Sequence, residues 1–84
     1  SLAVYITIKI RFGQTQRFEE FIPSVPEISE CHKLTGRDCM LLRGHVRDPK
    51  HLEDLNIRLA AYGELTTSLV LSSILDGKVY DAPF

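Results

Sequence analysis

The N-terminal segment of the chain alternates between apolar and more polar residues with a period of two. One set of alternating positions holds only large apolar side chains: Leu2, Val4, Ile6, Ile8, Ile10 and Phe12. The intervening positions carry Ala3, Tyr5, Thr7, Lys9 and Arg11. Successive side chains of a β-strand point to opposite faces of its sheet, and β-branched residues favour strands. This segment therefore predicts a strand with one deeply buried face, ended by Gly13.

Two helices are predicted after this strand. Residues 16–22 have apolar side chains at helical spacing, and Thr15 precedes them as a candidate N-terminal cap. The second helix starts at Asp48 and Pro49, since a capping carboxylate and a proline in the first turn are typical of a helix N-terminus. Its apolar stripe ends before Gly63, which we predict to be the left-handed residue that terminates the helix.

Three further strands are predicted over residues 28–34, 38–47 and 64–75, which are rich in β-branched and large apolar residues. A two-residue hairpin turn joins the first two of these strands, with Gly36 in its first central position. The resulting order, strand-helix-strand-strand-helix-strand, predicts an α+β fold, the ferredoxin-like βαββαβ plait. This fold consists of an antiparallel four-stranded sheet with two helices on one face.

The hairpin turn also predicts which residues face each other. Without a bulge, Glu30 lies opposite Arg43 as a cross-strand ion pair, and Ile28 lies opposite His45. The apolar residues on the sheet face without helices are then Ile28, Leu34, Leu41 and either Leu69 with Leu71 or Val70 with Ile74. Such an apolar patch marks an interface, so we predict that this open face packs against a second copy of the chain. The alternative is that the segment around residues 79–80 covers it.

The chain of 84 residues is long enough for one domain only. We predict that residues 1–75 form this domain and that residues 76–84 form a C-terminal turn followed by a tail or an edge strand. A domain this small buries a modest share of its surface on folding, which favours stabilisation by a partner subunit.

Charge and composition exclude several classes of protein. Ten Lys and Arg against eleven Asp and Glu leave a net charge of −1, so direct binding of nucleic acid has no basic excess to support it. The apolar runs are too short for a membrane span of about 20 residues. Two cysteines do not make a disulfide scaffold, so we expect a reducing, cytoplasmic compartment.

The cysteines and histidines do not form a recognisable metal or catalytic motif. They are Cys31, His32, Cys39, His45 and His51, and their spacing contains neither CxxC nor HxxxH. A catalytic cysteine would need an oriented histidine that nothing in the sequence supplies. We therefore expect no metal, no cofactor and no catalytic residue.

Two short polar stretches lie at the ends of predicted strands, in the hairpin turn and at the start of the last strand. Together they hold the candidate binding residues Thr35, Gly36, Arg37, Asp38, Thr66, Thr67 and Ser68. Backbone N–H groups beside Gly36, with Arg37 or the three hydroxyls, suit a carboxylate, and Asp38 suits an ammonium group. We interpret these stretches as a site for a small zwitterion that is completed across subunits. The alternative is an ordinary turn and an ordinary strand start.

Four segments of the chain carry a resemblance to a known family: residues 25–28 (VPEI), 35–43 (TGRDCMLLR), 47–52 (RDPKHL) and 66–73 (TTSLVLSS). In combination they resemble the C-terminal effector-binding domain, or RAM domain, of the Lrp/AsnC (feast/famine) transcriptional regulators. The resemblance covers roughly residues 2–75. It implies that the sheets dimerise, that dimers assemble further into rings or octamers, and that amino-acid effectors bind between dimers.

The resemblance also assigns roles to the candidate residues. The hairpin 35–38 and the segment 66–68 match the stretches that line the family's effector pocket. One departure concerns the hairpin, where the family often has an aromatic residue and then Asp, whereas this sequence has Asp38 and Cys39. The family's DNA-binding helix-turn-helix is not in this sequence, so contact with DNA would need a domain outside it. A truncated regulator and a stand-alone effector domain are both consistent with this.

The sequence thus predicts a ligand-sensing and oligomerisation domain of an Lrp/AsnC-type regulator that is not an enzyme. It would bind a small effector, an amino acid, between subunits of a homodimer or octamer, without contact with a membrane. One alternative is a small dimeric plait enzyme of the monooxygenase or isomerase type, for which His32 is the candidate catalytic group. Another is a structural dimerisation module without a ligand.

Overall fold

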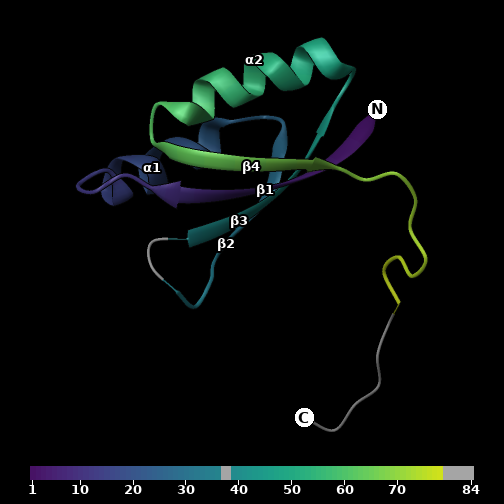
Figure 1. Ribbon diagram of the computed structural model, residues 1–84, viewed down its shortest axis with the longest axis horizontal. Coiled ribbons are helices and arrows are strands. Elements are labelled where there is room, and N and C mark those ends of the chain that lie inside the picture. Colours follow the sequence, from purple (N-terminus) through teal and green to yellow (C-terminus); the bar gives the residue numbers. More distant parts are fainter. Residues whose placement is uncertain (37–38, 79–84) are drawn as a thin grey trace, which may run out of the picture.

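The fold is an α+β plait with a sheet on one side and helices on the other (Figure 1). The computed structural model describes residues 1–36 and 39–78. Its elements are β1 (Leu2–Ile10), α1 (Thr15–Phe21), a 3₁₀ turn η1 (Ile22–Ser24), β2 (Ile28–Lys33), β3 (Cys39–Val46), α2 (Pro49–Ala60) and β4 (Gly63–Leu69). The strands of this described part form one four-stranded antiparallel sheet in the order β2-β3-β1-β4. The predicted ferredoxin-like βαββαβ plait is therefore confirmed.

The core lies between the helices and one face of the sheet. Alternate residues of β1 are buried, as their period of two predicted. They meet Phe18 of α1 and Leu55 and Leu59 of α2, so both helices cover the same sheet face. Phe12 is an exception to the predicted pattern, because β1 ends at Ile10 and the Phe12 side chain is 98% exposed in the following turn.

The ends of the helices correct two sequence predictions. Thr15 is the first residue of α1 rather than its cap, and Gln14 holds the cap position without a side-chain hydrogen bond. Gly63 is not a left-handed helix terminator but the first residue of β4. A Cβ at that position would lie 2.1 Å from the Lys9 carbonyl oxygen, so close packing of β4 on β1 explains the glycine. The Asp48 cap is confirmed, since its Oδ1 accepts the His51 N–H at 2.8 Å.

A β-bulge changes the predicted register at the start of the β2–β3 hairpin. Glu30 lies opposite Arg43 as predicted, but Ile28 lies opposite Gly44 instead of His45. The extra residue of a bulge shifts the pairing by one, and a shift by one moves a side chain to the other sheet face. Ile28 therefore packs against the core, and the prediction that it lies on the open face is wrong. The predicted turn type involves residues 37–38, which lie outside the described residues.

The last strand is shorter than predicted. It ends at Leu69 rather than at residue 75, and Val70 adds one hydrogen bond from its N–H to the Ala3 carbonyl, 3.0 Å long. Residues 70–78, which we term the C-terminal arm, then leave the sheet and run away from α2 (Figure 1). Neither helix in the described residues has the length and apolar character needed to cross a membrane.

Candidate functional site

The described residues of the hairpin half of the predicted site, Thr35 and Gly36, are exposed. Gly36 has a φ of +116°, which a residue with a side chain rarely adopts, and a Cβ there would meet no atom within 4 Å. Its backbone is therefore open to a small molecule. Arg37 and Asp38 lie outside the described residues. A cavity of about 210 Å³ lies at the foot of the hairpin and is lined by Thr15, Lys33, Leu34, Gly36, Cys39 and Met40.

The hydroxyl half of the predicted site is divided between the two faces of β4. Thr66 and Ser68 lie opposite Thr7 and Tyr5 of β1, on the open face. Thr67 points to the helix side, where its Oγ1 donates a hydrogen bond to Asn56 Oδ1 of α2 at 3.0 Å. Because a strand alternates its side chains, the three hydroxyls do not converge on one ligand. Thr66 and Ser68 face the side that lacks helices.

The two halves of the site also lie far apart within one chain. The hairpin follows β2, which is one edge of the sheet, and β4 is the other edge. Three strand spacings of about 4.8 Å separate these edges, or about 14 Å in all. One chain by itself therefore does not bring Gly36 and Ser68 to the same small ligand.

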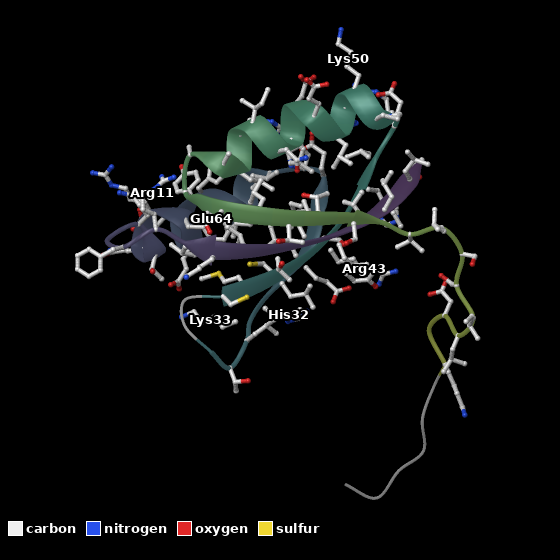
Figure 2. The ribbon with its side chains drawn as sticks, in the orientation of Figure 1. Arg11, His32, Lys33, Arg43, Lys50 and Glu64 are labelled. Carbon is white, nitrogen blue, oxygen red and sulfur yellow. The ribbon has the colours of Figure 1, made fainter. Side chains whose placement is uncertain are left out.

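A polar cluster lies on the open face between these halves. Glu30 of β2 contacts His32 Nε2 at 2.9 Å, and Arg43 of β3 donates to its other carboxylate oxygen at 3.2 Å. Figure 2 shows His32 and Arg43 on the side of the sheet away from α2. The hydrogen bonds from His32 and then from Arg43 lower the pKa of the Glu30 carboxyl. The predicted cross-strand ion pair is thus confirmed, although an exposed pair of this kind adds little stability.

The open face is less apolar than the sequence predicted. Its large apolar side chains are Tyr5, Leu41 and, at the hairpin end, Leu34, all of them exposed or half-buried. Leu69 lies on the helix side of β4, opposite Val4. Three further predicted members also lie elsewhere, because Ile28 joins the core while Leu71 and Ile74 lie beyond the sheet.

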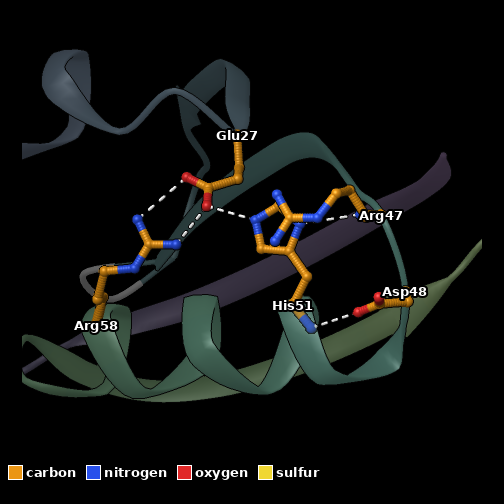
Figure 3. A network of polar contacts seen from close by, with 5 residues as sticks. All are labelled: Glu27, Arg47, Asp48, His51 and Arg58. Carbon is orange, nitrogen blue, oxygen red and sulfur yellow. Dashed lines mark hydrogen bonds and ion pairs between the residues drawn. The ribbon is translucent and has the colours of Figure 1, made fainter.

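A second polar cluster, which the sequence analysis missed, joins the start of β2 to α2 (Figure 3). The Glu27 side chain is 9% exposed and receives the His51 Nε2–H at 2.7 Å. Its two oxygens also accept hydrogen bonds from both terminal nitrogens of Arg58. The His51 Nδ1 accepts the Arg47 backbone N–H at 2.9 Å, so both ring nitrogens are engaged.

Electrostatics explain the role of this second cluster. The Arg58 hydrogen bonds, with a smaller contribution from His51, lower the pKa of Glu27 to about 2 against the opposing effect of burial. The spacing of His51 and Arg58 on one helical stripe was visible in the sequence, but the loop position of their carboxylate partner was not. The cluster therefore holds α2 against the loop before β2.

Two further features of the described residues are a groove beside α2 and a pair of cysteines. A shallow groove of about 760 Å³ separates α2 from the sheet edge and is lined by Glu53, Asn56, Ile57, Ala60, Gly63, Glu64, Leu65 and Thr67. Cys31 and Cys39 are both free thiols. Within the residues that the structure describes, no three His, Cys, Asp or Glu side chains are grouped to hold a metal ion.

The family is decided by a comparison that covers nearly the whole chain. The model of the Lrp/AsnC ligand binding domain matches residues 3–80. The chain belongs to this family. The resemblance stated from the sequence is thereby confirmed. Among curated proteins, the Lrp/AsnC domain described here is 23% identical over 65 residues to the HTH-type transcriptional regulator LrpC of Bacillus subtilis (strain 168).

Solved structures share the fold of this Lrp/AsnC domain. The structure of B. subtilis LrpC matches with a TM-score of 0.81 and 20% identity, covering 89% of this chain and 54% of that one. The crystal structure of MtbAldR matches with a TM-score of 0.72 and 18% identity, covering 92% of this chain and 57% of that one. A hypothetical protein from Pyrococcus horikoshii, PHS023, matches over 94% of this chain and 100% of its own, with a TM-score of 0.69 and 14% identity.

The chain spans about half the length of the curated relative that it matches. The match spans 77% of this chain but only 45% of the curated LrpC sequence. LrpC is described as a transcriptional regulator and the matching family as a ligand-binding domain, which favours a regulator over the alternative of a small plait enzyme.

Proposed function

We propose that this chain is the effector-sensing and oligomerisation domain of a cytoplasmic Lrp/AsnC-type transcriptional regulator, with an amino acid as its effector. The observation that carries the proposal is the position of the two candidate stretches on opposite edges of the sheet. A site that needs both edges is complete only when a second copy supplies one of them. Binding of the effector then depends on assembly, as a regulator requires.

The contacts of the effector follow from the chemistry of the seven candidate residues. Backbone N–H groups at Thr35 and Gly36, with Arg37, would hold the carboxylate of the amino acid. Asp38 would accept from its ammonium group. Thr66 and Ser68 face the open side of β4 and can contact a ligand there, whereas Thr67 is engaged by Asn56 and acts indirectly by holding β4 against α2.

Assembly would proceed through the open sheet face. Tyr5 and Leu41 supply apolar surface near its middle, and Glu30 of one copy can pair with Arg43 of the other across a two-fold axis. Dimers built in this way leave the hairpin tips free to meet other dimers, up to an octamer. An effector that binds between dimers favours one assembly state by its differential affinity, typically worth about 1–3 kcal/mol. DNA would be contacted only by a helix-turn-helix outside residues 1–84.

Calorimetric titration with each of the twenty amino acids, combined with sedimentation velocity at micromolar concentration, tests this function. We expect a self-associating protein, with heat from one amino acid or a small group of them and a shifted sedimentation profile in its presence. Twenty titrations without heat and an unchanged sedimentation profile would remove the effector proposal. A stable monomer at 100 μM would remove the assembly proposal.

A further inference from the structure

The C-terminal arm carries three large apolar side chains into solvent. Leu71 is 97% exposed, Leu75 is 72% exposed, and Ile74 between them is fully exposed. They lie within five consecutive residues of the arm. Large apolar side chains exposed so close together on a small domain indicate a contact with another molecule.

The arm does not use this surface on its own subunit. None of the described residues 70–78 belongs to the hydrophobic core or packs against it. The arm leaves the sheet after Leu69 and runs away from α2, as Figure 1 shows. Leu71, Ile74 and Leu75 therefore have no apolar neighbour on the helix side.

The arm lies on the side of the sheet where a second copy is expected. Arg43 is on the open face, opposite Tyr5 of β1. The hydrogen bond to Glu30 is the main cause that raises the pKa of Arg43, and the negative charge of Asp76 in the arm adds a small effect in the same direction. In Figure 2 the Arg43 side chain lies on the same side of the molecule as the arm.

The length of the arm suits a contact across the interface. Two sheets packed face to face are about 10 Å apart. The five residues from Leu71 to Leu75 reach up to about 17 Å when extended. An arm anchored at Leu69 therefore extends past the layer that a second sheet would occupy. The open face carries the polar Glu30, His32 and Arg43 beside Tyr5 and Leu41, so the arm adds apolar surface to that of the face.

We propose that the C-terminal arm of each subunit clasps a second copy of this chain seated on its open sheet face, with Leu71, Ile74 and Leu75 packed against that copy. This inference rests on the proposed sheet-face dimer and adds the segment that holds it together. In a two-fold dimer the contact occurs twice, once for each arm, so the arms strongly affect the dissociation constant.

The first test compares two variants of the full chain by sedimentation equilibrium. The arm variant combines Leu71→Ser, Ile74→Ser and Leu75→Ser, and the control is Ile57→Ser, an apolar residue on α2 that is 68% exposed. We expect the arm variant to raise the dimer dissociation constant more than tenfold, with the control within twofold of the wild type. If the wild type is a dimer and the arm variant has the same dissociation constant, the arm proposal is wrong. The sheet-face dimer is not contradicted by that result.

A second measurement distinguishes a clasp on the partner from an arm folded onto its own sheet. Hydrogen exchange of the arm amides is followed in the wild type at protein concentrations tenfold below and tenfold above the dissociation constant. Protection that rises with the fraction of dimer supports the clasp. Equal protection at both concentrations overturns it. A wild type that is monomeric at every concentration overturns the sheet-face dimer, and the arm proposal with it.

Discussion

Glu27 and Arg58 join two parts of the fold that are 31 positions apart in the sequence. The carboxylate of Glu27, in the loop before β2, accepts hydrogen bonds from both terminal nitrogens of the Arg58 guanidinium on α2. This bidentate pairing is stronger than an ion pair with a single hydrogen bond. The Glu27 carboxylate is also nearly buried. His51 adds a third hydrogen bond, so this contact fixes where α2 lies relative to the bulged start of β2.

Replacing the carboxylate of Glu27 is expected to destabilise the fold. Glu27→Gln keeps the shape of the side chain but removes the negative charge that Arg58 and His51 contact. Because Arg58 remains partly exposed to water, we expect a loss of about 2 kcal/mol in the free energy of unfolding. Urea denaturation at a fixed protein concentration measures it. The control Glu53→Gln, exposed on α2, should change stability by about 0.5 kcal/mol or less; equal effects of the two variants would contradict the prediction.

The same carboxylate predicts how stability depends on pH. The pKa of Glu27 is about 2 in the folded chain against 4.5 for an ordinary glutamate. A lowered folded-state pKa stabilises the fold fully above pH 4.5, and this stabilisation is lost as the pH falls from 4.5 towards 2. The difference in unfolding free energy between the wild type and Glu27→Gln should therefore shrink over this range. Urea denaturation at pH 6, 4, 3 and 2 measures this difference. A difference in unfolding free energy that stayed constant over this range would contradict the lowered pKa of Glu27.

Substitution by alanine should destabilise the fold more at Gly63 than at Gly13, because only Gly63 lies close to another strand. A Cβ on Gly63 would collide with the Lys9 carbonyl oxygen, so Gly63→Ala must separate β4 from β1 and should cost about 3 kcal/mol. Gly13 has open space around it and only a φ of +82°, so Gly13→Ala should cost about 1 kcal/mol. Thermal unfolding of the two variants side by side tests the order, and a larger effect at Gly13 would be inconsistent with the close strand contact.

The alternation along β4 predicts which hydroxyl contacts the effector. Ser68 faces the open side, so Ser68→Ala should weaken the affinity of the amino acid found by titration by about tenfold, the value of one hydrogen bond. Thr67→Val removes the hydrogen bond to Asn56 and should lower stability by about 1 kcal/mol without changing the affinity. Calorimetry and urea denaturation on both variants separate the two roles. An affinity loss confined to Thr67→Val would reverse the assignment.

The open face predicts a variant that stays folded but does not associate. Leu41 is half-buried near the middle of this face, and Leu41→Asp places a charge there that a second copy would have to bury. We expect a rise of at least a hundredfold in the dimer dissociation constant by sedimentation, with an unchanged circular dichroism spectrum. Ile57→Asp on α2 is the control and should associate as the wild type does. If both variants associate equally well, the open face is not the interface.

The sequence determined the elements of this fold because their signals are local. The period of two in β1 shows its buried face directly, and Asp48 with Pro49 marks the start of α2. The order of these elements is enough to select the βαββαβ plait. The hairpin register from Glu30 onward also follows from the turn, and Glu30 and Arg43 meet as predicted.

Tertiary structure decided where these elements end and which face their residues take. The bulge after Ile28 depends on Gly44 leaving room beside the Glu27 backbone, a contact between residues far apart in sequence. Gly63 is explained by the Lys9 carbonyl and not by the end of α2. The strand β4 ends at Leu69 although strand-forming residues continue after it. The local sequence pattern indicates whether a segment forms a helix or a strand. Contacts with residues far apart in the sequence decide where that element ends and which of its side chains are buried.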